Sequence, residues 1–206
     1  MRTHDHVLVV VDVQNDFCPG GALAVPEGDR VVPVVNRLLD RFELVVFTQD
    51  WHPANHRSFA STHPGREPYD VVPMAYGEQV LWPDHCVQGR QGAAFHPELR
   101  LDCANLIIRK GTTPEIDSYS TFFENDKRTS TGLAGYLRDR GVRHVLLAGL
   151  ATDFCVLWSS LDARRLGFEV TVIEDACRGI DLNGSLENAW RDMDEAGVNR
   201  VTSSHL

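Results

Sequence analysis

The amino-acid sequence predicts an α/β domain in which helices cover both faces of a parallel sheet. Apolar runs of strand length, rich in β-branched residues, alternate along the chain with segments of helical periodicity. The strongest runs lack polar alternation, which is typical of strands buried on both faces. At 206 residues the chain is long enough for one well-buried domain. We find no internal repeat, low-complexity segment or linker, and therefore expect a single domain over residues 1–206.

The first part of the chain is expected to supply two strands and a helix. Residues 7–11 (VLVVV) form a continuous β-branched run that Asp12 closes. Residues 29–42 space Val and Leu as a helix does, with Pro33 near the start, where proline is tolerated. Residues 43–50 (ELVVFTQD) predict the second strand, which also ends in an aspartate.

A long stretch at about 51–105 separates these elements from the rest of the fold. It lacks strong periodicity and carries much of the proline and histidine. A loop of this length in a compact domain is usually functional rather than connective. We therefore expect it to form a metal- and substrate-binding region.

The remaining elements again alternate between strand and helix. Residues 105–110 predict a third strand, and residues 129–140 predict a helix that Gly141 stops. Residues 143–149 predict a fourth strand that turns into a helix with Cys155 in its first turn. The last elements expected are a fifth strand, a helix and a short sixth strand, at residues 168–175, 185–197 and 199–204.

The composition excludes several classes of function. The formal net charge is −9 and no Lys/Arg cluster offsets it, so no binding to nucleic acid is expected. The apolar run near the N-terminus is too short for a signal peptide or a membrane span, so we expect a cytoplasmic protein that binds no membrane. The five cysteines are widely spaced without a CxxC pair, which favours free thiols in a reducing compartment.

Four reactive groups fall at the carboxyl ends of predicted strands, which is where open α/β sheets bind ligands. Asp12, Asp50 and Lys110 end or follow three of the strands, and the turn that carries Cys155 follows another. A cysteine at a helix start faces unpaired N–H groups and the positive end of the helix dipole, which favour thiolate. Asp12 can accept the thiol proton, and Lys110 can stabilise both anions. The alternative is a structural Asp12–Lys110 ion pair beside a small buried cysteine.

The segment DWHPANH, residues 50–56, indicates a metal site. Asp50 and His52 lie two positions apart on an extended segment, so their side chains point to the same side. His85, further along the loop, completes a set that would leave coordination positions open. The alternatives are chance clustering of histidines, a helix cap or a surface patch. Phe17 and Trp82 can enclose a flat aromatic ligand, although core packing is the commoner fate of such residues.

Five segments together resemble the bacterial nicotinamidase/pyrazinamidase family, within the isochorismatase-like cysteine hydrolase superfamily. They are VDVQNDF, TQDWHPANH, LWPDHCVQG, RKGTTPEIDSYSTFF and GLATDFCV, and they occur in the order of the family. The resemblance extends from about residue 6 to residue 200. It implies the isochorismatase-like hydrolase fold, a three-layer αβα arrangement with a six-stranded, mainly parallel sheet.

The resemblance also implies roles for individual residues. The catalytic triad corresponds to Asp12, Lys110 and Cys155. The metal ligands correspond to Asp50, His52 and His85, with His56 at a position that ligates in some members only. The residues around the substrate ring correspond to Phe17, Trp82 and Tyr119. A cis peptide corresponds to Leu150–Ala151, and it would turn the N–H of Ala151 toward an oxyanion beside the N–H of Cys155.

The activity that the resemblance implies is hydrolysis of nicotinamide to nicotinate and ammonia through a thioester on Cys155, with a role in NAD salvage. Pyrazinamide is expected as a further substrate. One divalent metal ion would bind the ring nitrogen, with Zn²⁺ favoured and Fe²⁺ or Mn²⁺ as alternatives. The competing interpretations are an N-carbamoyl-amine hydrolase, an isochorismatase proper and a catalytically silent metal-binding or scaffold protein. The sequence leaves monomer and homo-oligomer open.

Overall fold

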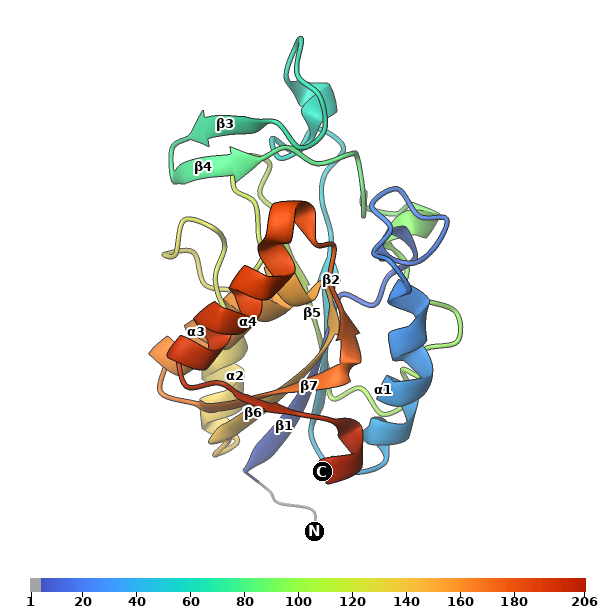
Figure 1. The fold of residues 1–206 in the computed structure, drawn as a ribbon, viewed down its shortest axis with the longest axis vertical. Coiled ribbons are helices and arrows are strands. Elements are labelled where there is room, and N and C mark those ends of the chain that lie inside the picture. Colours follow the sequence, from blue (N-terminus) through green and yellow to red (C-terminus); the bar gives the residue numbers. More distant parts are fainter. Residues whose placement is uncertain (1–4) are drawn as a thin grey trace.

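A computed structural model describes residues 5–206, and its centre is a six-stranded sheet in which every strand pairing is parallel. The strands run in the order β5-β2-β1-β6-β7-β8. In chain order they are β1 (His6–Val11), β2 (Val45–Asp50), β5 (Leu106–Lys110), β6 (His144–Leu150), β7 (Glu169–Arg178) and β8 (Asn199–Val201). The predicted parallel sheet is confirmed (Figure 1). Residues 1–4 of the predicted domain lie outside the described residues.

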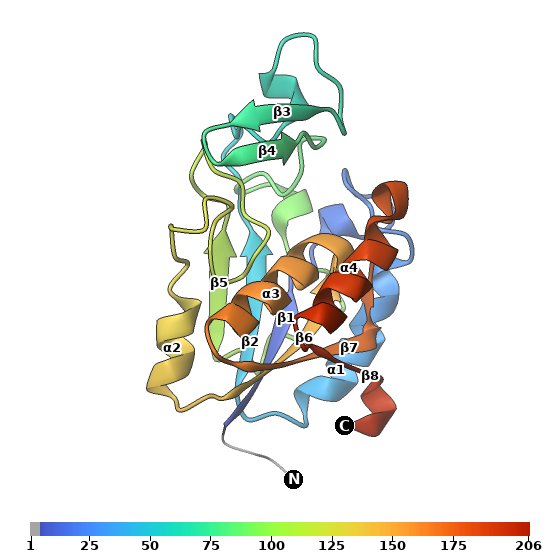
Figure 2. The same cartoon turned by 60° about the vertical axis from the view of Figure 1, so that its left-hand side comes forward.

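Helices cover both faces of this sheet, as Figures 1 and 2 show. On one face lies α1 (Val31–Leu39), and on the other lie α2 (Leu133–Asp139), α3 (Leu157–Arg165) and α4 (Ser185–Glu195). Successive side chains of β1 alternate between the two apolar cores. Leu8 and Val10 pack with the residues of α1, whereas Val7, Val9 and Val11 pack with those of the other three helices. The run VLVVV lacks polar alternation because both of its faces are buried.

The region at about 51–105 is more ordered than the sequence predicts. It contains a two-stranded antiparallel hairpin, β3 (Val71–Met74) and β4 (Gly77–Val80), which lies beyond the carboxyl ends of the main strands (Figure 2). The two strands have four residues each, and Val71 is half exposed. Strands this short and this exposed carry little hydrophobic periodicity, so the sequence did not indicate them.

After the adjacent strands β1 and β6, the chain continues toward opposite edges of the sheet. β1 lies beside β6, but β1 is followed by β2 on one side and β6 is followed by β7 on the other. This is the position at which ligands bind in open parallel sheets. Asp12 follows β1 directly, and residues 151–156 follow β6. Among residues 5–206, no helix combines the length and the apolarity that crossing a membrane requires.

Candidate active site and metal centre

The buried ammonium group of Lys110 lies at the centre of the candidate site. Its side chain is fully buried and extends from the end of β5 past the end of β2. The Nζ atom lies 2.9 Å from Oδ2 of Asp12 and 3.6 Å from Sγ of Cys155. It also donates to Oδ1 of Asp50 and, at 2.7 Å, to the Ser118 carbonyl. One cation therefore joins the three reactive groups that the sequence places at strand ends.

Asp12 is held in one orientation by its backbone and by two partners. Its φ of +47° lies in the left-handed region, so the chain bends away from the sheet directly after β1. The Thr48 hydroxyl donates to Oδ1 of Asp12 at 2.6 Å, while Oδ2 faces Lys110. Burial raises the pKa of Asp12 above its ordinary value, although Lys110 lowers it. A buried carboxylate with a raised pKa is suited to accepting a proton.

Cys155 lies in the first turn of the helix that follows β6, as predicted; this turn, Thr152–Val156, is π-helical and continues into α3. Burial raises the pKa of its thiol well above the ordinary value, although Lys110 lowers it. Asp12 and Asp50 raise this pKa further. Burial thus outweighs the expected stabilisation of thiolate by Lys110. A nucleophilic role for this sulfur would therefore require a base beside it.

The turn between β6 and Cys155 has the unusual backbone that the family resemblance implies. The Leu150–Ala151 peptide is cis. The Ala151 carbonyl accepts from the N–H groups of Phe154 and Val156 at 3.1 and 3.0 Å, and neither bond uses the N–H of Cys155. Gly149 has a φ of +123°, and a Cβ there would lie 2.1 Å from the Val11 carbonyl oxygen. Only glycine allows β6 to approach β1 this closely. The oxyanion roles of Ala151 and Cys155 stay predictions.

The three predicted metal ligands converge on one point. Oδ2 of Asp50 lies 3.5 Å from Nε2 of His52 and 3.8 Å from Nε2 of His85. The Nδ1 atoms lie 2.9 Å from the Gly111 carbonyl in His52 and 2.8 Å from the Pro83 carbonyl in His85. A carbonyl oxygen can only accept, so each Nδ1 donates a proton to it and each Nε2 is left facing the shared point. Nε2 of His52 is buried without a hydrogen-bond partner, as a metal-ligating nitrogen would be.

The charges around this point also fit a divalent cation. Asp12, Asp50 and Asp117 are buried carboxylates, and Lys110 is the buried ammonium among them. Burial lowers the pKa of His85, so this imidazole is neutral at neutral pH. Buried charges need partners, and a metal ion at the convergence point would supply one. Two imidazoles and one carboxylate with open positions suit Zn²⁺, Fe²⁺ or Mn²⁺.

His56 lies beside this set rather than within it. Its ring centroid is 4.2 Å from that of His52. Its Nδ1 lies 2.7 Å from the Ser58 hydroxyl and its Nε2 lies 3.2 Å from the Ile116 carbonyl, so both nitrogens are engaged. Burial lowers the pKa of His56 to about 4 and keeps the ring neutral. Direct ligation by His56 stays a prediction, whereas packing against His52 is its role in this structure.

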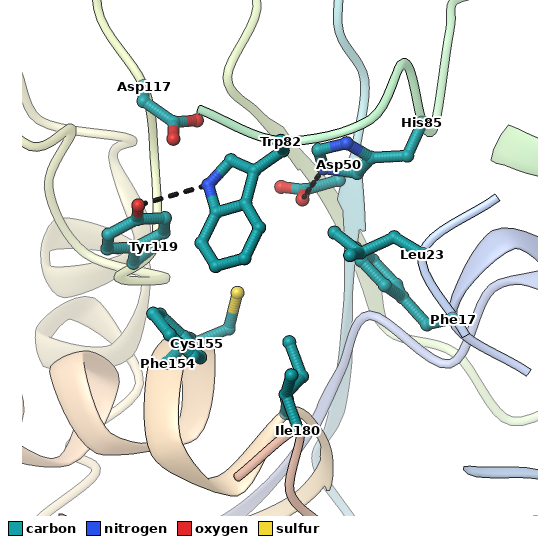
Figure 3. Close-up of a pocket in the computed structure, with 11 residues that line it drawn as sticks. Phe17, Leu23, Asp50, Trp82, His85, Asp117, Tyr119, Phe154, Cys155 and Ile180 are labelled. Atoms are coloured by element: carbon teal, nitrogen blue, oxygen red, sulfur yellow. Dashed lines mark hydrogen bonds and ion pairs between the residues drawn. The ribbon is translucent and has the colours of Figure 1, made fainter. Parts of the chain in front are cut away.

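A small pocket joins the thiol to the metal set (Figure 3). Phe17 lies on one side of the pocket and Trp82 on the other, as Figure 3 shows. Trp82 donates through Nε1 to the Tyr119 hydroxyl at 3.1 Å. The structure thus brings together the three aromatic residues that the resemblance places around a substrate ring.

Four further residues line this pocket, and the sequence did not single them out: Leu23, Asp117, Phe154 and Ile180. Phe154 directly precedes Cys155, and its ring meets that of Trp82 edge-on at a centroid distance of 4.9 Å. This adjacency to Cys155 is the one signal that could have identified it. The others lie in irregular segments, where spacing predicts no shared face.

Asp153, buried between the pocket and α4, ties the cysteine turn to the wall that carries Ile180. Its carboxylate accepts from the N–H of Ile180 at 2.9 Å and from the N–H of Asp181 at 2.8 Å. The Ser185 hydroxyl at the start of α4 donates to the same carboxylate. One side chain thus ties the turn that carries Phe154 and Cys155 to the segment that carries Ile180.

Comparison with known proteins agrees with this arrangement. The model of the isochorismatase domain matches residues 6–205, and the chain belongs to the isochorismatase family of hydrolases. It is similar to a nicotinamidase of Acinetobacter baylyi, with 55% identity over 205 residues that cover 100% of this chain and 96% of the relative.

Two solved structures carry the comparison further. An Acinetobacter nicotinamidase and pyrazinamidase superposes with a TM-score of 0.98 at 56% identity, covering 100% of this chain and 99% of the other. A pyrazinamidase of Pyrococcus horikoshii in complex with zinc superposes with a TM-score of 0.78 at 39% identity, covering 96% and 99%. The predicted fold and family are therefore confirmed.

Proposed function

We propose that the protein hydrolyses nicotinamide to nicotinate and ammonia. The observation that carries this proposal is one small pocket lined by aromatic side chains. The thiol of Cys155, with Asp12 beside it, lies at one end, and the Asp50–His52–His85 set converges at the other. The first end suits a carboxamide, and the second suits the nitrogen of a pyridine ring. The full-length relatives named nicotinamidases support the same substrate.

In the first half-reaction Asp12 takes the proton of Cys155 as sulfur attacks the carboxamide carbon. The C–S bond forms, and the N–H groups of Ala151 and Cys155 stabilise the oxyanion while Lys110 balances the charge of Asp12. Removing one oxyanion donor in comparable sites costs about 10²–10³ in rate. Asp12 then passes its proton to the amide nitrogen. The C–N bond breaks, ammonia leaves and a thioester remains.

In the second half-reaction Asp12 takes a proton from water, and the hydroxide attacks the thioester carbonyl. The C–S bond breaks, nicotinate leaves and the sulfur regains its proton from Asp12. The same carboxylate thus serves as base and acid in both halves, which its contact with Lys110 and its raised pKa allow.

Asp50, His52 and His85 would hold one divalent metal ion, which when bound supplies a Lewis-acid contact that orients the ring nitrogen. We favour Zn²⁺, with Fe²⁺ or Mn²⁺ as alternatives. Phe17, Trp82 and Tyr119 would enclose the ring and exclude water. Pyrazinamide, which also has a ring nitrogen and a carboxamide, is proposed as a second substrate, and release of nicotinate would serve NAD salvage in the cytoplasm.

An N-carbamoyl-amine hydrolase would use the same Asp12, Lys110 and Cys155 but would not need a ring-anchoring metal set. Ammonia release from nicotinamide and from N-carbamoyl amines, measured with elemental analysis of the purified protein, separates the two. We expect release from nicotinamide by metal-containing protein, and its loss after chelation. Release from N-carbamoyl amines alone would refute the proposal, and no release from either substrate would favour a catalytically silent protein.

A further inference from the structure

Gln14, in the segment between Asp12 and Phe17, is fully buried, and its side chain bonds only to backbone groups. Its Oε1 accepts from the N–H of Asp50 at 2.8 Å. Its Nε2 donates to the carbonyl of Asp50 at 2.8 Å and to the carbonyl of Ala93 at 2.9 Å. A single amide therefore satisfies both backbone groups of Asp50.

The sheet explains why a side chain is needed at this point. The pairing of β1 with β2 ends at Val10 and Phe47, whereas β2 continues to Asp50. On its other edge, Asp50 is paired in register with Lys110 of β5. Because the chain leaves the sheet at Asp12, the edge of Asp50 that faces β1 has lost its strand neighbour. The carboxamide of Gln14 takes the place of the missing peptide group, since it offers the same donor and acceptor.

The consequence is that Asp50 is held on every side before any metal binds. Gln14 fixes its backbone, and Lys110 binds Oδ1. The remaining oxygen, Oδ2, is left facing Nε2 of His52 and Nε2 of His85. A small rotation of the Asp50 backbone would move Oδ2 away from the two nitrogens, and a chelating set needs all three atoms in place at once.

We propose that Gln14 is a positioning residue that presets Asp50 for metal binding. This inference rests on the metal site of the proposed function. It also joins the two ends of the pocket, because Gln14 belongs to the same short segment as the base Asp12 and the ring-contacting Phe17. Glutamine is the side chain that fits. A glutamate would lose both N–H donors and would add a carboxylate beside the Asp50 carbonyl.

The chain offers a matched control in Gln49. This buried glutamine also donates to the Ala93 carbonyl, at 2.8 Å, and its Oε1 accepts from Arg109. Replacing either glutamine with methionine keeps the side-chain length and removes one bond to Ala93. Only Gln14→Met also removes both bonds to Asp50.

The test is the affinity of the metal-free protein for Zn²⁺, measured by competition with a chromophoric chelator. Loss of an outer-shell partner typically weakens metal binding by about 10–100-fold. We expect a weakening in that range for Gln14→Met and an affinity near that of the wild type for Gln49→Met. Visible spectra of the Co²⁺-loaded proteins provide a second readout, which should change for Gln14→Met alone.

Thermal unfolding of the metal-free proteins separates positioning from general stability. A merely structural role would lower the Tm of Gln14→Met and leave the Zn²⁺ affinity of the folded protein unchanged. Should Gln14→Met fail to fold, Gln14→Asn keeps the amide on a shorter side chain and is expected to weaken Zn²⁺ binding as well. Wild-type affinity in the folded Gln14 variants, or equal weakening in Gln49→Met, would overturn the inference. Absence of nicotinamide hydrolysis in the wild type would instead refute the proposed function and leave this comparison intact.

Discussion

Replacing Asp12 with asparagine removes one proton-accepting oxygen and changes little else in the shape of the site. In the wild type one carboxylate oxygen accepts from the Thr48 hydroxyl, and the other faces Lys110 at 2.9 Å. Asparagine can still accept from Thr48 through its oxygen. Its NH₂ group would then face the ammonium group of Lys110, donor against donor, and it cannot take the proton of Cys155.

The expected loss of turnover follows from the proposed role of Asp12 as a general base. A positioned general base contributes about 10²–10⁴ in rate. Burial raises the pKa of Cys155, and in Asp12→Asn no carboxylate beside the sulfur can accept the thiol proton. We therefore expect kcat for nicotinamide to fall by at least about 10³ in Asp12→Asn, near the middle of that range.

The fold should survive this substitution. Breaking a buried ion pair costs about 3–5 kcal/mol when it leaves a charge without compensation. In Asp12→Asn, Lys110 keeps its ion pair with Asp50 and its hydrogen bond to the Ser118 carbonyl, so the cost should lie below that range. The assay combines ammonia release, urea unfolding and Zn²⁺ affinity. Turnover near that of the wild type, in a variant that folds and binds metal, would refute the assignment of Asp12 as base.

Three further predictions probe other parts of the site. Cys155→Ala should abolish turnover while metal and nicotinamide binding, measured by calorimetry, persist, whereas His52→Ala should weaken both binding and turnover. Equal loss of binding in the two variants would contradict the separation of nucleophile and metal set. Gly111→Ala should weaken Zn²⁺ affinity by about 10–100-fold, because a Cβ there would lie 2.3 Å from Cε1 of His52, and wild-type affinity would disprove this steric argument. Thr48→Val removes a hydrogen bond that lowers the pKa of Asp12, so the acidic limb of the kcat/KM pH profile should move to higher pH; an unmoved limb would exclude Asp12 as the titrating base.

Much of the fold could be predicted from the sequence because the central strands β1, β2 and β6 are buried on both faces. Runs such as VLVVV at 7–11 lack polar alternation for that reason, and each predicted strand corresponds to one in the sheet. The hairpin of β3 and β4 was not predicted, since its strands are short and partly exposed and carry little hydrophobic periodicity. The π-helical form of the turn at Thr152–Val156 was not predicted either, because the hydrogen bond from the N–H of Val156 to the Ala151 carbonyl leaves no periodic pattern in the sequence.

The candidate site could likewise be predicted only in part from the sequence. Asp12, Asp50 and Lys110 could be brought together from sequence because the carboxyl ends of parallel strands share one edge of the sheet. His85 lies in a loop, so its spacing from His52 only suggested a shared metal set, and the family resemblance supported that pairing. Gln14 could not be predicted, because hydrogen bonds from a side chain to a distant backbone leave no periodic trace in the sequence.

The direction in which the pKa of Cys155 shifts could not be predicted from the sequence either. A helix start near a lysine favours thiolate, but the depth of burial decides the outcome, and burial is a property of the folded chain. In the proposed mechanism, the carboxylate of Asp12 rather than the helix end therefore activates Cys155.

The most direct test of the account is interception of the thioester on Cys155. Metal-loaded protein is incubated with nicotinamide in the presence of hydroxylamine, which competes with water for a thioester. The account predicts nicotinohydroxamate alongside nicotinate for the wild type, and neither product for Cys155→Ala. Nicotinate without hydroxamate, formed equally by the Cys155→Ala variant, would show that water attacks the amide directly and would contradict a covalent mechanism.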